Sequence, residues 1–363
     1  MKPAYVIYPL HSFGFLDAGL FTDASNLPTS EALAREHGVA VTAQHRSLES
    51  VAQWLQQVHE WFGVEGNVPF ELLHHWQRSR SGWLATNPLV VVRVYELSGG
   101  AYYENQHLLS DRLHVATAFL AGLSVRQPPT EPDENRRLFS TRSVNNWSTL
   151  DIGHYYVMNS VTDDKGFLTG EAVPMNIDAG YLAELSDLPV DLDMAHWSGT
   201  RDDARSLWQA LNSVGDAQAA TRFRRKPKND APARTARKMF ESLDYFRRSL
   251  GSDRWYAVTS LGTAFEMLLT SHYEPGVTNR LRRRVQLLTN DATSADAVER
   301  LYHARSKLVH AGESPPEELD LATAQRAYLA CFESLAPKLS SLRPEEGNPL
   351  REMTGDTLEE PRR

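Results

Sequence analysis

The C-terminal third of the chain carries the stretch Leu301-Tyr-His-Ala-Arg-Ser-Lys-Leu-Val-His-Ala-Gly312, which reads as the end of a helix closed by a glycine. Within it, Arg305 precedes His310 by five residues. An imidazole can move protons near pH 7, and a guanidinium can hold a phosphate and the charge that develops on it. These are the two groups that a metal-free ribonuclease needs.

The spacing of these two residues limits what a single copy of the stretch can do. Five residues at about 100° each place the two side chains about 140° apart around a regular helix. A working site therefore needs the reach of Arg305, unwinding at the helix end, or a second copy across a symmetric dimer. We expect Arg305 and His310 to supply half of a site.

The surrounding residues, 234–342, show helical periodicity that predicts a compact bundle. Short breaks separate the successive helices, and short connections favour antiparallel neighbours. The expected helices are Thr235–Leu250, Arg254–Tyr273, Val277–Thr289, Ala295–His310 and Glu317–Leu339.

Three segments of this bundle occur in an order that resembles a known family. The first, Ser260-Leu-Gly-Thr-Ala-Phe-Glu-Met-Leu-Leu269, places Glu266 in the second helix. The next, Asn279-Arg-Leu-Arg-Arg-Arg-Val-Gln-Leu-Leu288, is an arginine-bearing third helix, and Arg305 to His310 has the pattern Arg-x4–6-His. Together they resemble HEPN domains, and most of all the Apea-like branch of prokaryotic defence proteins. The resemblance covers about residues 235–340.

The chain departs from the family pattern at two positions. Ser306 follows the arginine where active ribonucleases of this group often have Asn, Asp or His. Ala311 separates the histidine from the glycine that often follows it directly. A serine hydroxyl can still hydrogen-bond a phosphate or orient the arginine, so these departures bear on catalysis rather than on the fold.

The resemblance implies a metal-independent endoribonuclease without a cofactor, active as a homodimer through the bundle. The 2′-OH of the RNA substrate would be the nucleophile, with His310 moving a proton and Arg305 stabilising charge on the phosphate. The ends left would be a 2′,3′-cyclic phosphate and a 5′-OH. Glu266, Ser306 and Lys307 would be auxiliary residues, and Glu266 would pair with Arg305 or hold its orientation. Glu266 suits a buried structural ion pair equally well.

A non-catalytic interpretation also fits these observations. In it, the HEPN-type bundle binds RNA or a nucleotide, or only mediates dimerisation on behalf of the rest of the chain. A third interpretation places an unrecognised enzymatic activity in residues 1–220. A role in antiviral or stress defence follows from the family analogy alone.

Two basic clusters lie on a chain whose formal net charge is −8. That net charge excludes a protein that coats nucleic acid through bulk charge, but a local basic surface is compatible with a phosphate-bearing ligand. A solvated linker and a polar helix face explain the clusters equally well. The clusters are residues 222–238 and the third-helix arginines, of which Arg280, Arg283 and Arg284 are candidate RNA contacts.

Residues 1–221 predict an α+β domain, so the expected fold is an α+β N-terminal domain followed by an all-α HEPN-like bundle. We expect this domain to act as a sensor, a regulator or a partner-binding module, for instance for a protein or phage-derived trigger. The expected strands are Ala4–Pro9, Leu89–Leu97, His154–Met158 and one around Ala172–Ile177; the expected helices are Leu48–Phe62, Leu108–Leu123 and Asp202–Val214.

The remaining segments and the composition predict the boundaries and the compartment. Residues 222–233 read as a basic linker, and residues 343–363 as a disordered tail because they have little apolar surface.

The single cysteine, Cys331, fits a reducing compartment and a core position. No apolar run approaches the roughly 20 residues that cross a bilayer, so we expect a cytoplasmic protein. His107 and His114 lack the further ligands of a metal site.

Overall fold

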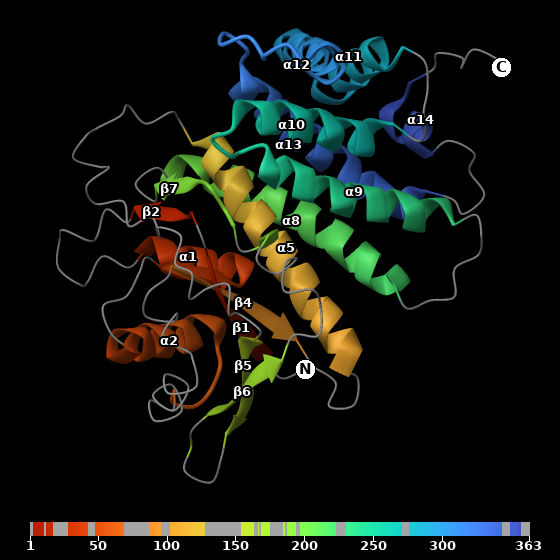
Figure 1. The fold of residues 1–363 in the computed structure, drawn as a ribbon. Coiled ribbons are helices and arrows are strands. Elements are labelled where there is room, and N and C mark those ends of the chain that lie inside the picture. The colour runs from red at the N-terminus through yellow and green to blue at the C-terminus, as the bar shows by residue number, and fades with distance from the viewer. Residues whose placement is uncertain are drawn as a thin grey trace. The chain divides into compact units, whose positions relative to one another are not determined.

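The computed structural model divides the chain into two compact units, Met1–Arg205 and Ser206–Arg363 (Figure 1). Each unit is described by itself. The structure describes residues 3–10, 12–16, 28–42, 48–68, 88–95, 102–127, 154–162, 166, 168–174, 184–185, 187–193, 197–222, 230–270, 276–342 and 349–356.

The first unit combines strands and helices, as the sequence predicts for an α+β domain. Its strands are β1 (Pro3–Pro9), β2 (Gly14–Leu16), β3 (Val39–Thr42), β4 (Leu89–Tyr95), β5 (His154–Thr162), β6 (Leu168–Pro174) and β7 (Asp191–Asp193). Its helices are α1 (Pro28–His37), α2 (Leu48–Phe62), α5 (Tyr102–Arg126) and the start of α8 (Trp197–Arg222), which continues into the second unit.

The main sheet of this unit is antiparallel, with the strand order β3-β4-β1-β5-β6. Its central strand β1 is buried on both faces, because Tyr5 and Ile7 join the core cluster formed with α2, while the Tyr8 hydroxyl donates to the Leu109 carbonyl of α5 at 2.6 Å. Such a strand reads as a continuous apolar run rather than an alternating one. A separate parallel pair joins β2 and β7.

Helix α5 is long and carries an extended apolar segment. By length and composition its segment His107–Arg126 could cross a membrane, although the sequence analysis found no such run. In the structure, 78% of the most apolar window of that segment is buried inside the protein. That enclosure is what the core helix of a soluble domain shows.

The described residues of the second unit form helices and no strand, and these helices confirm the predicted helical bundle to within a few residues at each end. Four of the helices begin after an aspartate whose side chain accepts backbone N–H groups, namely Asp230, Asp253, Asp291 and Asp320. The helices are α9 (Ala231–Arg248), α10 (Arg254–Leu269), α11 (Val277–Thr289), α12 (Ala292–Ala311), α13 (Leu321–Leu335), the 3-10 helix η4 (Ala336–Ser341) and α14 (Pro349–Thr354).

Aromatic packing fills the centre of this bundle. Tyr328 of α13 stacks on Phe246 of α9 with ring centroids 4.8 Å apart, and Phe265 of α10 meets the same ring edge-on at 5.6 Å. The Tyr328 hydroxyl also hydrogen-bonds Ser242 at 2.5 Å. Cys331 is fully buried beside this cluster on α13, and burial raises the pKa of its thiol, so it is the core residue that the sequence predicts.

The predicted linker at residues 222–233 differs from what the structure shows. Residues 231–233 open α9, and the two compact units meet within α8, between Arg205 and Ser206. The proline that suggests a linker, Pro232, lies in the first turn of α9 after its Asp230 cap, where a missing N–H costs no hydrogen bond. Residues 223–229 lie outside the described part of the chain.

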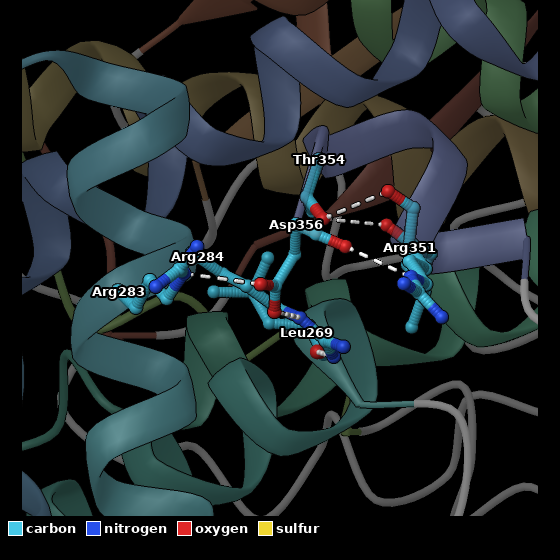
Figure 2. Close-up of polar contacts among 7 residues, drawn as sticks. Leu269, Arg283, Arg284, Arg351, Thr354 and Asp356 are labelled. Carbon is cyan, nitrogen blue, oxygen red and sulfur yellow. Dashed lines mark hydrogen bonds and ion pairs between the residues drawn. The ribbon is translucent and has the colours of Figure 1, made fainter. Parts of the chain in front are cut away.

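The prediction of a disordered tail is wrong for residues 349–356. These residues form α14 and a turn that closes it, with Leu350 and Met353 buried. Gly355 has a φ of +69°, and this turn brings the Asp356 carboxylate to Arg283 and Arg284 at 3.0 and 3.2 Å (Figure 2). This segment is too polar to be expected to fold by itself, and it is held in the structure because Asp356 compensates the charge of the buried Arg284.

Candidate functional site

Helix α12 carries the stretch that the sequence analysis singled out. Asp291 caps its start by accepting from the backbone N–H groups of Thr293 and Ser294 at 3.0 and 2.9 Å. At its end Gly312 adopts a left-handed φ of 69° and its N–H returns to the Leu308 carbonyl at 3.1 Å. The predicted glycine-closed end is confirmed, and the helix stays regular up to Ala311.

The Arg305 guanidinium meets an acid and a phenol at the contact between α12 and α10. Its Nη1 and Nη2 atoms donate to the two carboxylate oxygens of Glu266 at 3.2 and 3.1 Å. Nη1 also lies 3.2 Å from the Tyr302 hydroxyl, which itself donates to Glu266. The guanidinium carbon lies 5.3 Å from the centre of the Tyr302 ring. We call Arg305, Glu266 and Tyr302 the Arg305 cluster.

A glycine on α10 makes room for this arrangement. A Cβ atom added to Gly262 would lie 2.3 Å from Cδ of Arg305, closer than real carbon atoms approach. The arginine stem therefore lies directly against the α10 backbone. Glu266 follows Gly262 by four residues, about one helical turn, so it stands beside the head of the same arginine.

The Arg305 cluster is partly open to solvent. The side chains of Arg305 and Glu266 are 23% and 30% exposed. Burial, and after it the hydrogen bond to Glu266, raises the pKa of Tyr302 to about 12. The phenol therefore stays protonated, and a hydrogen-bond donor, at neutral pH.

His310 lies away from this cluster. It is exposed in the last turn of α12, and none of the described contacts of Arg305 or Glu266 involves it. On a helix that is regular over this span, the two side chains are about 140° apart around the axis. The structure therefore brings Glu266 to Arg305 as expected but leaves His310 on another face.

The other auxiliary residues share the exposed face of α12 with His310. Ser306 and Lys307 are exposed, and Lys307 lies 3.9 Å from Glu313 in a solvated ion pair. His303, seven residues before His310, is also exposed and lies within about 20° of the same line along the helix. Neither Ser306 nor Lys307 takes part in the described contacts of the Arg305 cluster.

The structure buries one of the three α11 arginines that the sequence offers as RNA contacts. Arg284 is 2% exposed and bonds the Leu269 carbonyl and Asp356 (Figure 2), so the expectation that it contacts RNA is wrong. Its charge is buried and is compensated by a carboxylate inside the protein. Arg283 pairs with the same acid, and Arg282 pairs with Asp296 at 2.8 Å. Arg280, the remaining candidate, is half-buried.

The described residues hold no group of three or more His, Cys, Asp or Glu side chains able to bind a metal ion. Tyr302 and Gly262 are site residues that the sequence did not predict. Their only signals were spacings of three residues to Arg305 and four to Glu266, which need the register between two helices to become informative.

No protein-family model, curated protein or solved structure matches the chain.

Proposed function

We propose that the chain is a cytoplasmic, metal-independent endoribonuclease of HEPN type that acts through Arg305 and His310. One observation carries the proposal. A partly exposed arginine, oriented by an acid and a phenol, lies on the same helix as an exposed histidine at its glycine-closed end. Residues 1–205 would then serve as the sensor or partner-binding module in antiviral or stress defence.

The reaction follows from the chemistry of these two groups. The 2′-oxygen of RNA attacks the adjacent phosphorus while a neutral imidazole takes its proton. The bond from phosphorus to the 5′-oxygen breaks, and an imidazolium gives that oxygen a proton. Arg305 would neutralise the charge that grows on the non-bridging oxygens. The ends produced are a 2′,3′-cyclic phosphate and a 5′-OH.

A second copy of the chain supplies what one α12 lacks. Because Arg305 and His310 point in different directions from a regular helix, two α12 helices facing each other across a two-fold axis would place two imidazoles beside one phosphate. The surface next to His310 supports such a contact. Val309 is 57% exposed, and an apolar side chain that is open in one chain gains by being covered in a pair.

One observation favours a non-catalytic bundle instead. The charge of Arg305 is already matched by Glu266, and the described contacts of this pair do not extend to His310. In this second candidate function, the bundle binds RNA or a nucleotide, or pairs two chains, without cleaving a substrate. The first unit would then carry the biological activity.

One experiment separates these two functions. The purified full chain is incubated with mixed RNA in excess EDTA, beside His310→Ala, Arg305→Ala and the matched control His303→Ala. His303 is exposed on the same face of α12, so its loss tests for unspecific effects of removing an imidazole. The products are sequenced and their ends are identified.

The ribonuclease proposal expects cyclic phosphate ends from the wild type and from His303→Ala. Loss of a proton-transfer group costs about 10²- to 10⁴-fold, so His310→Ala should fall by that factor. Equal cleavage by His310→Ala and the wild type would refute the assignment. RNA that stays intact with every added trigger would favour the non-catalytic function.

A further inference from the structure

A single carboxylate fills a small receptor formed by two side chains of α12. Both Nη atoms of Arg305 and the hydroxyl of Tyr302 donate to Glu266, so three donors converge on its two oxygens. All three donors belong to Tyr302 and Arg305, which are three residues apart on α12. Side chains at this spacing lie next to each other on one face of a helix. The acceptor comes from a different helix, α10.

This set of donors suits a phosphate as well as it suits a carboxylate. A guanidinium offers two parallel N–H groups that match two oxygens of either anion. A neutral phenol beside it adds a third donor without adding charge. A phosphodiester presents two non-bridging oxygens that share one negative charge. It can therefore accept the same three hydrogen bonds in place of the carboxylate.

The surroundings decide which of the two partners can move. The Arg305 stem lies against Gly262, where even a Cβ atom would not fit, and its Nε is buried without a hydrogen-bond partner among the described residues. The stem of Arg305 is therefore packed against α10, which restricts the positions that its guanidinium can take. Glu266 is 30% exposed on a flexible side chain and can turn toward solvent.

We propose that Arg305 and Tyr302 form a receptor for the phosphodiester of a nucleic acid, and that Glu266 occupies it as an internal competitor in the resting chain. The inference rests on the proposed function for its substrate class. It assigns Tyr302 to phosphate binding and gives Glu266 a restraining role. When the phosphate arrives, the Glu266 carboxylate leaves and the Tyr302 hydroxyl exchanges one anion for the other.

Two roles of Glu266 predict opposite signs for one substitution. If Glu266 competes with phosphate, Glu266→Gln removes the competing charge and substrate binds more tightly. If Glu266 only orients Arg305, the same change loosens the arginine and substrate binds more weakly. The amide keeps the size of the side chain and its ability to accept a hydrogen bond, so the fold is preserved.

Binding is measured with a 2′-O-methyl RNA oligonucleotide, which lacks the attacking hydroxyl and cannot be cleaved. Its fluorescence anisotropy is followed with the full chain in EDTA for the wild type, Glu266→Gln, Tyr302→Phe and Arg305→Gln. Glu299→Gln is the matched control, because Glu299 pairs with Arg282 at 3.0 Å and has a similar exposure of 33%. Thermal unfolding checks that each variant is folded.

The receptor predicts a ranking of the dissociation constants. Glu266→Gln should bind about three- to fivefold more tightly than the wild type, as expected for loss of a partly exposed ion pair. Tyr302→Phe should bind about fivefold more weakly through loss of one hydrogen bond. Arg305→Gln should be the weakest, and Glu299→Gln should equal the wild type.

The receptor is overturned by weaker binding by Glu266→Gln than by the wild type, or by binding that none of the three substitutions changes. A chain that binds no oligonucleotide in any form also overturns it. Ordinary RNA tested in parallel keeps the two proposals apart. The ranking without cleavage leaves the receptor standing and removes the ribonuclease; cleavage that needs Arg305 and His310, without the ranking, does the reverse.

Discussion

Two arginine–carboxylate pairs in the second unit have the same chemistry and different surroundings. Arg284 and Asp356 are 2% and 4% exposed, and the arginine also bonds the Leu269 carbonyl (Figure 2). Arg305 and Glu266 are 23% and 30% exposed, and their third partner is the hydroxyl of Tyr302. The Arg284–Asp356 pair is buried, and the Arg305–Glu266 pair is partly exposed to solvent.

The difference shows that burial decides whether a charged side chain can exchange its ion-pair partner for a ligand. An ion deep in a protein cannot exchange its partner for a ligand without leaving a charge uncompensated, which costs several kcal/mol. An ion pair at the surface is worth about 1 kcal/mol or less, so an incoming anion can replace one member. The proposed phosphate receptor therefore lies at Arg305, while Arg284, which the sequence also offers as a candidate RNA contact, holds the C-terminal segment.

The largest expected effect comes from the buried pair. Asp356→Asn leaves the charge of Arg284 without its carboxylate, and we expect the free energy of unfolding to fall by about 3 kcal/mol. Chemical denaturation followed by circular dichroism measures it. Asp296→Asn is the control, because Asp296 pairs with Arg282 at 2.8 Å while 50% exposed, and it should change stability by less than about 1 kcal/mol. Equal losses for both variants would contradict the distinction between the pairs.

A methyl group at Gly262 tests how closely the exposed pair depends on its fit. Gly262→Ala forces Arg305 away from α10, and overpacking of this kind costs about 1–3 kcal/mol. We expect both lower stability and weaker binding of the 2′-O-methyl oligonucleotide. Gly251→Ala is the control, since a Cβ atom there meets only the Arg248 carbonyl at 3.6 Å. Unchanged binding by Gly262→Ala would mean that Arg305 does not need its position for the ligand.

Removal of the exposed carboxylate should hardly affect the fold. Glu266→Gln weakens a partly exposed ion pair, so we expect the free energy of unfolding to change by less than about 1 kcal/mol. The same denaturation experiment measures it beside Asp356→Asn. A loss as large as that of Asp356→Asn would show that Glu266 is a structural residue and would remove the basis for its exchange with phosphate.

The smallest effect concerns the alkaline titration of the Arg305 cluster. The pKa of Tyr302 is raised to about 12, so its protonated form is favoured by folding. This contribution to stability is complete below the ordinary tyrosine pKa of about 10 and is lost as the pH rises through 12. Ultraviolet difference titration of the wild type against Tyr302→Phe should show one phenol that ionises near pH 12. Ionisation of that phenol near pH 10 would contradict the burial of Tyr302 and its contact with Glu266.

Helix positions in the second unit were accessible from the sequence because they depend on local information. Apolar periodicity and the glycine at Gly312 located α12, although the helix begins at Ala292 after its Asp291 cap, three residues before the predicted start. The pairing of Glu266 with Arg305 came from the order of segments. Tyr302 and Gly262 could not be found in this way, because their roles depend on how α10 and α12 are aligned against each other.

The sequence by itself determined five helices of the second unit, from α9 to α13, and where α12 ends, since capping and the helical repeat act over a few residues. Only the tertiary structure decided which arginine is available. Arg284 finds its acid 72 residues away and Arg305 finds its acid 39 residues away. The local sequence around each arginine does not indicate how deeply its side chain is buried. Burial depends on the packing of distant elements, and burial fixes one arginine in the interior while it leaves the other open to a ligand.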